Sequence, residues 1–288
     1  MSFEFVHFED LAEPLTVDRN LQSCQVAGLS LKQLQEKYLS PLEQLEKTVF
    51  VRSNAWLSES AVKSLLEGKS SVVSDGIVLA TTDRAELDRV STLDSACETS
   101  FEIKYAWDLL RVNEQVIGAM SEDSIKGEVY DSAVIEGNVQ IGEGTKILPG
   151  VYIEGNVIIG KDCKIGPNCY IRGNTFIGDN CHVGQSVEIK NSILMNRTNV
   201  GHLSYVGDSV LGTKVNFGAG TTTSNLRHDN SNHHSMVQGK LVNTGRRKFG
   251  VIIGDGVHTG INTSFYPGRK MWPGTTTLPG EVLQQDKK

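Results

Sequence analysis

Cysteine and histidine are the side chains of this 288-residue chain whose types and spacing suggest metal, redox or proton-transfer chemistry. Cys163, Cys169 and Cys181 lie close together in the sequence, and Cys163 and Cys181 are 18 residues apart. The spacing could fit a metal or redox site, but cysteine is so often a small buried hydrophobic residue that we expect these three to be buried in a repeat. His233 and His234 are adjacent, but no third ligand at zinc spacing stands beside them. The sequence therefore predicts no metal site.

Residues 1–125 contain none of the short motifs that carry enzyme chemistry. They have no glycine-rich phosphate loop, no acidic pair at metal-binding spacing and no convincing nucleophile. The residues that could do chemistry are therefore expected in the second half of the chain.

A six-residue repeat dominates the second half. Every sixth residue from Val129 is a large aliphatic one, in the series Val129, Ile135, Ile141, Ile147, Ile153, Ile159, Ile165, Ile171, Ile177, Val183, Ile189 and Met195. Each hexad predicts one short strand and one corner, with the aliphatic residue pointing inward. Three hexads, roughly 18 residues, close one turn of a triangular coil, and stacked turns bury a continuous core. The sequence thus predicts a β-solenoid.

The repeat changes register after Met195. Aliphatic positions resume out of phase at Leu211 and Phe217, and the new phase returns at Ile253, Thr259, Phe265, Met271 and Thr277. Residues 224–250 form a polar stretch without hexads. Because a long excursion from a rigid repeat is usually a functional loop, we expect the chemistry near the register change and under this loop.

The N-terminal residues predict a small α+β domain. Ser30 and Ser58 are expected to cap helices that end near Leu39 and Gly68, and Ser40-Pro41 starts another. Thr48–Arg52 is a strand candidate, and Ser71–Thr81 reads as two strands around Asp75-Gly76. Residues 105–120 are expected to be helical, with an apolar face of Trp107, Leu109, Leu110, Val116 and Ile117.

The segment Gly201-His202-Leu203-Ser204-Tyr205-Val206-Gly207-Asp208, followed by residues 216–221 (Asn-Phe-Gly-Ala-Gly-Thr), carries a resemblance to a known family. It resembles the acetyltransferase half of bifunctional enzymes that acetylate glucosamine-1-phosphate and then add a uridylyl group. Segments 225–229 and 244–248 are similar to the archaeal-type sugar-1-phosphate nucleotidyltransferase/acetyltransferase subgroup. The match covers roughly residues 101–283, and Phe101–Ile117 looks like the link between the two halves of such enzymes.

The resemblance implies a fold and an activity. The fold class is mainly β: a left-handed parallel β-helix over residues 126–283 with an inserted loop at 224–250, preceded by a small α+β domain over residues 1–125. That domain looks like a shortened nucleotidyltransferase remnant, because the family's glycine-rich loop is missing and only residues 11–16 are faintly similar to its signature. The implied activity is transfer of acetyl from acetyl-CoA, a co-substrate, to the 2-amino group of an amino-sugar 1-phosphate in nucleotide-sugar biosynthesis.

The resemblance also implies roles for single residues. Imidazole has an ordinary pKa near 6.5, which suits a general base, and His202 takes that role. Guanidinium and ammonium groups suit a sugar phosphate. The implied substrate-binding residues are Arg172, Lys190, Tyr205, Asn216, Asn225 and Lys248. For acetyl-CoA they are Ala219, Gly220, Arg246 and Arg247, although the two arginines could instead only position the loop.

One departure concerns substrate choice. The archaeal-type relatives place lysines where this chain has Ser231 and His234, so the preference between glucosamine and galactosamine phosphates is open. Relatives with this solenoid are trimers that form sites between neighbouring subunits, so a homotrimer is expected.

Composition limits the partners and the cellular compartment that the sequence predicts. A net charge of −6 favours no nucleic-acid partner, no apolar run predicts a membrane span, and five cysteines without a secretion signal predict free thiols in the cytoplasm. Three alternatives remain: a nucleotidyltransferase whose solenoid only assembles it, a non-catalytic scaffold, and a solenoid carbonic anhydrase. The last needs three converging histidines, and the spacing of His182, His202 and His258 does not match that family.

Overall fold

The computed structural model describes residues 2–89 and 99–288. The chain divides into two compact units. The first comprises residues 1–11, 20–24 and 29–105, and the second comprises residues 12–19, 25–28 and 106–288. The division expected from the sequence, at residues 125 and 126, stays a prediction. In the structure the helix before the solenoid groups with the solenoid, and it contacts one of the solenoid strands.

The first unit is a small α+β fold. Its main sheet has the order β1-β4-β7-β6, and β5 pairs with β8. The elements are β1 (Phe3–Val6), η1 (Leu21–Ser23), β3 (Leu29–Ser30), α1 (Leu31–Leu39), η2 (Ser40–Gln44), β4 (Val49–Arg52), β5 (Ala55–Trp56), α2 (Glu59–Leu66), β6 (Ser71–Ser74), β7 (Ile77–Thr81), η3 (Arg84–Glu86) and β8 (Phe101–Glu102).

The helix starts predicted in this unit are confirmed. Ser30 forms a capping box with Gln33 at the start of α1, and the Ser58 side chain accepts a hydrogen bond from the Ala61 N–H at the start of α2. The segment after Pro41 is a 3₁₀ helix rather than an α-helix. Valines and leucines of both helices and the sheet, including Leu42, Val49, Val51 and Leu79, form one buried cluster.

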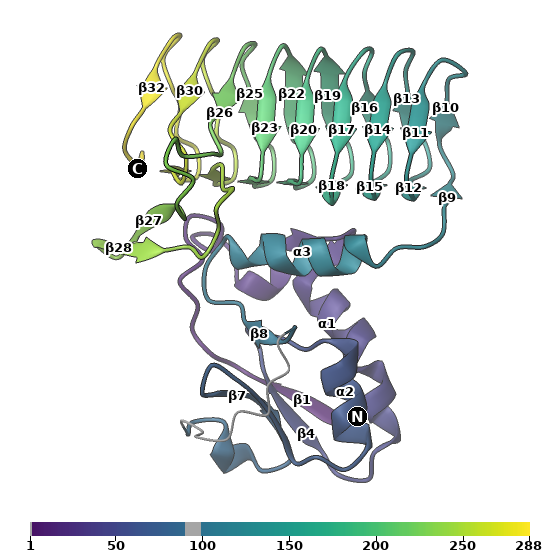
Figure 1. The fold of residues 1–288 in the computed structure, drawn as a ribbon, viewed down its shortest axis with the longest axis vertical. Coiled ribbons are helices and arrows are strands. Elements are labelled where there is room, and N and C mark those ends of the chain that lie inside the picture. Colours follow the sequence, from purple (N-terminus) through teal and green to yellow (C-terminus); the bar gives the residue numbers. More distant parts are fainter. Residues whose placement is uncertain (1, 90–98) are drawn as a thin grey trace. The chain divides into compact units, whose positions relative to one another are not determined.

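The second unit is a parallel β-solenoid with three faces, and its stacked strands run side by side in Figure 1. Face 1 consists of β10 (Glu128–Val129), β13 (Lys146–Ile147), β16 (Lys164–Ile165), β19 (His182–Gln185), β22 (Asn199–His202) and β25 (Asn216–Phe217). Face 2 consists of β11 (Val134–Glu136), β14 (Tyr152–Glu154), β17 (Tyr170–Arg172), β20 (Glu188–Lys190), β23 (Tyr205–Gly207), β26 (Thr222–Thr223), β30 (Ser264–Phe265) and β32 (Val282–Leu283). Face 3 consists of β9 (Ser124–Ile125), β12 (Val139–Ile141), β15 (Val157–Ile159), β18 (Thr175–Ile177), β21 (Ile193–Leu194), β24 (Val210–Leu211), β29 (Ile252–Ile253) and β31 (Lys270–Met271).

The hexad residues fill the solenoid core, so the predicted left-handed parallel β-helix preceded by a small α+β domain is confirmed. The members of the series from Ile141 to Ile189 belong to one buried cluster that runs along the stack. Cys163, Cys169 and Cys181 are buried free thiols within it, as is Cys24 in the first unit, whereas Cys97 lies outside the described residues.

The position predicted for the register change is wrong by one residue. Ile177 pairs with Leu194, which joins the core cluster, whereas Met195 does not belong to that cluster. The corner at Asn191 is one residue shorter than the corner at Gly173, so this coil takes 17 residues instead of 18. The corner at Asp208 is equally short, so two short corners together produce the later phase of Leu211 and Phe217.

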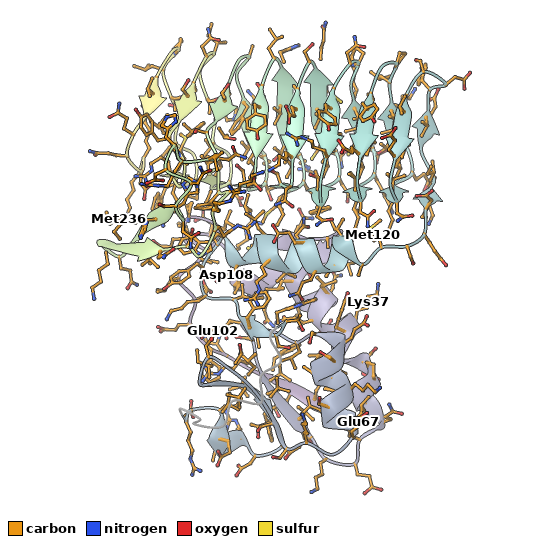
Figure 2. All side chains as sticks on the ribbon, viewed as in Figure 1. Lys37, Glu67, Glu102, Asp108, Met120 and Met236 are labelled. Carbon is orange, nitrogen blue, oxygen red and sulfur yellow. The ribbon has the colours of Figure 1, made fainter. Side chains whose placement is uncertain are left out.

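Two further parts of this unit bear on the site. Helix α3 (Asp108–Gly118) contacts β18 and runs along the stack, between the labels of Asp108 and Met120 in Figure 2. It buries Leu109, Leu110 and Ile117 as predicted, and Val112 in addition, whereas Val116 of the predicted apolar face is only half-buried. The 224–250 loop contains an antiparallel hairpin of β27 (His234–Val237) and β28 (Lys240–Asn243). Segment 25–28 carries the short strand β2 (Gln25–Val26).

Candidate functional site

Face 2 gathers three of the residues singled out from the sequence. Arg172 and Lys190 end neighbouring strands and are in register with Gly207 of the next strand. Tyr205 starts that strand and is in register with Glu188. Because neighbouring strands lie about 4.8 Å apart, the parallel stacking brings these side chains onto one small area.

Arg172 is held by an acidic neighbour on the adjacent strand. Its Nε and Nη2 atoms donate to Glu188 Oε1 at 2.8 and 2.7 Å. The guanidinium also lies 5.3 Å from the centre of the Tyr170 ring. The Nη1 atom donates to none of the described residues, so one edge of this cation is open to a ligand.

Lys190 forms an ion pair with a nearly buried carboxylate. Its Nζ atom lies 2.9 Å from Asp208 Oδ2, and the two side chains are 14% and 3% exposed. The other carboxylate oxygen of Asp208 accepts from Asn191 Nδ2 at 3.0 Å. Several donors therefore satisfy the buried charge of Asp208, as burial of a carboxylate requires.

Asn225, the first part of the loop to meet this group, joins Tyr205 to Asp208. Its Nδ2 atom donates to Tyr205 Oη at 3.0 Å and to Asp208 Oδ2 at 2.5 Å. A Cβ on Gly207 would come within 2.4 Å of Tyr205 Oη and 2.7 Å of Asn225 Nδ2, so only glycine leaves room for this contact. Burial raises the pKa of Tyr205, with the Asp208 and Glu188 charges adding to it, so its hydroxyl stays protonated at neutral pH.

His233 fixes the backbone of Asn225. Its Nε2 atom lies 3.0 Å from the Asn225 carbonyl oxygen. A carbonyl only accepts, so Nε2 carries the proton. Burial lowers the pKa of His233, which keeps the ring neutral at neutral pH.

His202 lies at the corner between faces 1 and 2, three residues before Tyr205. It ends β22 and is exposed, and its imidazole makes no hydrogen bond to any described residue. The Gly220 N–H donates to the His202 carbonyl oxygen at 3.1 Å, so the next coil places Ala219 and Gly220 directly beside it. The Ala219 carbonyl in turn accepts from Asn262 at 2.7 Å. The structure thus brings the candidate base together with two of the residues expected to meet acetyl-CoA.

Asn216 and Lys248 occupy different surroundings. Asn216 belongs to face 1, in register with Asn199 and beside His258. Lys248 is exposed at the end of the loop, where its backbone bridges to Leu226, and its ammonium pairs with none of the described residues.

Arg246 and Arg247 both contact parts of the second unit that shape the loop. Arg246 Nη2 lies 2.5 Å from Glu114 Oε1 on α3, and its Nε is buried without a partner among the described residues. Arg247 Nη1 donates to Asn230 Oδ1 at 3.3 Å, within the loop. These contacts favour the loop-positioning interpretation of both arginines.

Sequence reasoning missed the acidic and amide residues that organise the site, namely Glu114, Glu188, Asn191, Asp208 and His233. The shortened corner at Asn191 was the available signal, since a lost residue in a regular repeat marks an irregular contact. The hydrogen bonds of Asp208 and Glu114 depend on tertiary structure, so no periodic pattern in the sequence predicts them.

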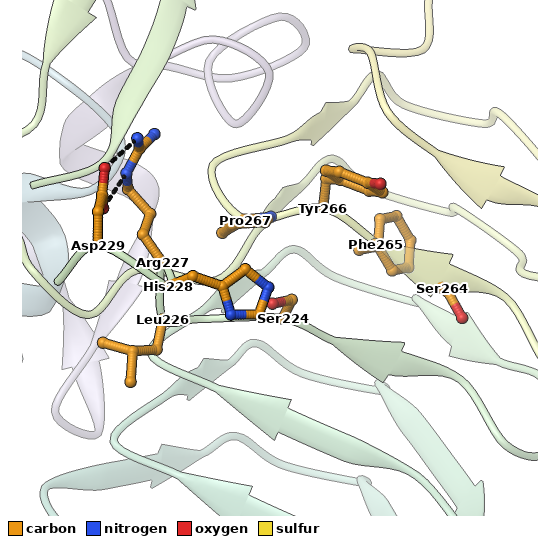
Figure 3. Close-up of a pocket in the computed structure, with 9 residues that line it drawn as sticks. All are labelled: Ser224, Leu226, Arg227, His228, Asp229, Ser264, Phe265, Tyr266 and Pro267. Carbon is orange, nitrogen blue, oxygen red and sulfur yellow. Dashed lines mark hydrogen bonds and ion pairs between the residues drawn. The ribbon is translucent and has the colours of Figure 1, made fainter. Parts of the chain in front are cut away.

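A hollow of about 520 Å³ lies beside this group (Figure 3). Its walls come from Ser224 and residues 226–229 of the loop and from residues 264–267 after β30. Arg227 and Asp229 pair bidentately at 2.9 and 2.7 Å, so the cation in the wall is already neutralised. Because Ser224 and Leu226 flank Asn225, the hollow adjoins the candidate site.

No group of three or more His, Cys, Asp or Glu side chains among the described residues is arranged to hold a metal ion. None of the helices in the described part is both long and apolar enough to cross a membrane.

Comparison with known proteins places this geometry in context. A family model described as the GMPPB C-terminal domain matches residues 153–263. The chain is 42% identical over 185 residues to a bifunctional sugar-1-phosphate nucleotidylyltransferase/acetyltransferase of Sulfurisphaera tokodaii, covering 64% of this chain and 46% of that protein. It is 51% identical over 179 residues to the bifunctional protein GlmU of Methanococcus maripaludis, covering 62% of this chain and 43% of that protein.

A solved structure of a UDP-N-acetylglucosamine acyltransferase from Francisella novicida is 17% identical, covers 55% of this chain and 62% of that chain, and has a TM-score of 0.31. The chain spans about half the length of the curated relatives it matches. Over its C-terminal half, this chain is homologous to the bifunctional sugar-1-phosphate nucleotidylyltransferase/acetyltransferases, in agreement with the resemblance of residues 101–283.

Proposed function

We propose that this chain transfers acetyl from acetyl-CoA to the 2-amino group of an amino-sugar 1-phosphate. One observation carries the proposal. The exposed His202, which has no hydrogen-bond partner among the described residues, lies three residues before Tyr205. The Tyr205 strand pairs with the strand of Lys190, which in turn pairs with the strand of Arg172. A candidate base and a cationic, hydrogen-bonding area are thus held on adjacent parts of one rigid stack.

His202 acts as the general base in this proposal. The amine nitrogen attacks the thioester carbonyl carbon, and a bond from nitrogen to carbon forms. The imidazole takes the proton that the nitrogen loses, the bond from carbon to sulfur breaks, and the thiolate leaves and is protonated. The products are an N-acetyl sugar phosphate and free coenzyme A thiol.

Arg172, Lys190 and Lys248 bind the phosphate. The open Nη1 edge of Arg172 offers a directed donor, and Lys190 adds positive charge. Lys248 is exposed on the loop and can turn toward the same anion. Tyr205 and Asn225 supply hydrogen bonds to the sugar. Asn216 lies on face 1, so it would contribute to a sugar held between neighbouring subunits.

The backbone at Ala219 suits the developing oxyanion. The Gly220 N–H is occupied by the His202 carbonyl, whereas the Ala219 N–H donates to none of the described residues. An N–H fixed beside the base stabilises the negative charge that appears on the thioester oxygen in the transition state. Gly220 lets acetyl-CoA approach the backbone, and Arg246 and Arg247 hold the loop that borders the site.

We further infer that the protein works as a cytoplasmic homotrimer whose neighbouring subunits complete each site. The exposure of His202 and Lys248 in a single chain supports this assembly. Sedimentation at the mass of one chain, at the concentration where activity is measured, would contradict it.

Residues 1–125 are proposed to be a shortened, inactive relative of a nucleotidyltransferase domain. They offer no glycine-rich loop whose backbone amides would hold phosphates. Release of pyrophosphate from a nucleoside triphosphate and a sugar-1-phosphate by the purified protein would show this part of the proposal to be wrong.

The acetyltransferase proposal is tested by incubating purified protein with acetyl-CoA and either glucosamine-1-phosphate or galactosamine-1-phosphate. Thiol release that depends on the sugar is the expected result. Thiol release with neither sugar would favour another amino-sugar acceptor, and then the non-catalytic scaffold.

A further inference from the structure

Glu114, in the middle of α3, has a side chain that bonds to two separate parts of the solenoid unit. Its Oε1 atom accepts from Arg246 Nη2 at 2.5 Å and from Asn191 Nδ2 at 2.7 Å. Its Oε2 atom accepts from Arg246 Nη1 at 3.3 Å. One carboxylate therefore joins the helix, the shortened corner at Asn191 and the far end of the 224–250 loop.

The contacts of Glu114 continue into the candidate sugar site. The Asn191 side-chain amide donates both to Glu114 and to Asp208 Oδ1. The other carboxylate oxygen of Asp208, Oδ2, accepts hydrogen bonds from Lys190 and Asn225. Every step in this series is a hydrogen bond of 3.0 Å or less. The loop is thus fixed at both ends by one connected network, through Asn225 near its start and Arg246 near its end.

The charge of Glu114 is important because the Arg246 guanidinium pairs with no other group among the described residues. The Arg246 side chain is 18% exposed and its Nε is buried without an acceptor among the described residues. Removing the carboxylate charge leaves a mostly buried guanidinium uncompensated, which favours movement of Arg246 toward solvent. Such movement releases the end of the loop and weakens the hold of Asn191 on Asp208.

We propose that Glu114 is a positioning residue for the amino-sugar phosphate, so that α3 is part of the acetyltransferase and the solenoid alone is incomplete. This inference rests on the proposed function of the same site. Glu114 acts through Arg246, Asn191 and Asp208, and it does not touch the reacting atoms.

The role predicts an effect on acceptor binding that general loss of stability would not give. In Glu114→Gln the side chain keeps its size and one acceptor oxygen but loses its charge. Because hydrogen bonds to charged groups are worth more than neutral ones, we expect the KM for the sugar phosphate to rise about tenfold. The KM for acetyl-CoA should stay unchanged. Glu114→Asp keeps the charge and should recover much of the loss.

The experiment compares wild type, Glu114→Gln, Glu114→Asp and the control Glu122→Gln by steady-state kinetics, thermal melting and calorimetric binding of the sugar phosphate. Glu122 is an exposed carboxylate after α3 with no hydrogen bond to the described residues, so its variant should behave as wild type. A selective rise in the acceptor KM, with matching weaker binding and rescue by aspartate, supports the inference.

Two results would overturn it, and they differ from failure of the proposed function. An active wild type whose Glu114→Gln variant keeps its acceptor KM and affinity removes the positioning role and leaves the acetyltransferase intact. A wild type that neither transfers acetyl nor binds either sugar phosphate removes both. Sugar-phosphate binding without acetyl transfer still decides the inference, through the affinities of the two Glu114 variants.

Discussion

Lys190 and Asp208 form an ion pair at 2.9 Å in which the carboxylate is only 3% exposed. Asp208 also accepts from the side chains of Asn191 and Asn225, so this one buried charge holds together a strand end, a corner and the start of the loop.

Asp208→Asn should therefore lower the free energy of unfolding by about 3 kcal/mol, because it leaves the Lys190 charge without its partner in a mostly buried place. Chemical denaturation measures this loss. Asp229→Asn is the matched control, since the Arg227–Asp229 pair is exposed on the loop and should contribute nothing measurable. Equal effects of the two substitutions would contradict the buried-pair account.

Two glycines of the same repeat row should respond oppositely to alanine. A Cβ on Gly184 would lie 1.9 Å from the carbonyl oxygen of Gly201 in the next coil, so Gly184→Ala must displace backbone and lower the melting temperature. A Cβ on Gly201 meets nothing within 4 Å, so Gly201→Ala should fold with little change in melting temperature. Gly201 precedes His202, and the added methyl group should lower acetyl transfer by partly blocking that corner.

Thermal melting and thiol release on both variants separate these effects. A stable Gly184→Ala protein would show that the coils are less tightly stacked there than the structure has them. Full activity in Gly201→Ala would place the acyl donor elsewhere than the His202 corner.

Acid should weaken the hold of the loop through His233. Burial lowers the pKa of this ring, so the unfolded chain binds a proton at higher pH than the folded chain does. The stability that the neutral ring contributes is complete above its unfolded pKa of about 6.5. It is lost as the pH falls from there toward the lower folded value.

His233→Gln, whose amide can donate to the Asn225 carbonyl and does not titrate, should flatten this part of the stability curve. The check is melting temperature against pH for the two proteins. His182, whose pKa is also lowered by burial, remains in both proteins and sets the common background. Parallel curves would show that His233 does not contribute.

Much of the fold could be predicted because a repeating core produces a periodic pattern of aliphatic residues in the sequence. The series from Val129 to Ile189 needs a buried aliphatic residue at every sixth position, and a six-residue period has few other structural meanings. The sequence could not show in the same way whether Leu194 or Met195 is the inward-facing residue at the register change. Both residues are apolar, and only the pairing of Ile177 with Leu194 shows which one faces the core.

The sequence identified candidate residues that the structure brings close together, but not the residues that hydrogen-bond to them. Arg172, Lys190, Tyr205 and Asn225 are brought together on face 2, and His202 meets Ala219 and Gly220 at the corner. Glu114 lies 77 residues from Asn191 and 132 from Arg246, so its contacts have no local sequence pattern. Asp208 is part of the 201–208 segment, but the sequence did not indicate that its carboxylate would pair with Lys190.

The most direct test of the central claim is thiol release from acetyl-CoA with glucosamine-1-phosphate or galactosamine-1-phosphate, by wild type, His202→Ala and the control His182→Ala. His202 is exposed and hydrogen-bonds through its ring to none of the described residues, so its variant should melt as wild type does while losing roughly a hundredfold or more in kcat. His182→Ala should keep most of the activity. Sugar-dependent thiol release that survives His202→Ala unchanged would contradict the account, because the base would then lie elsewhere.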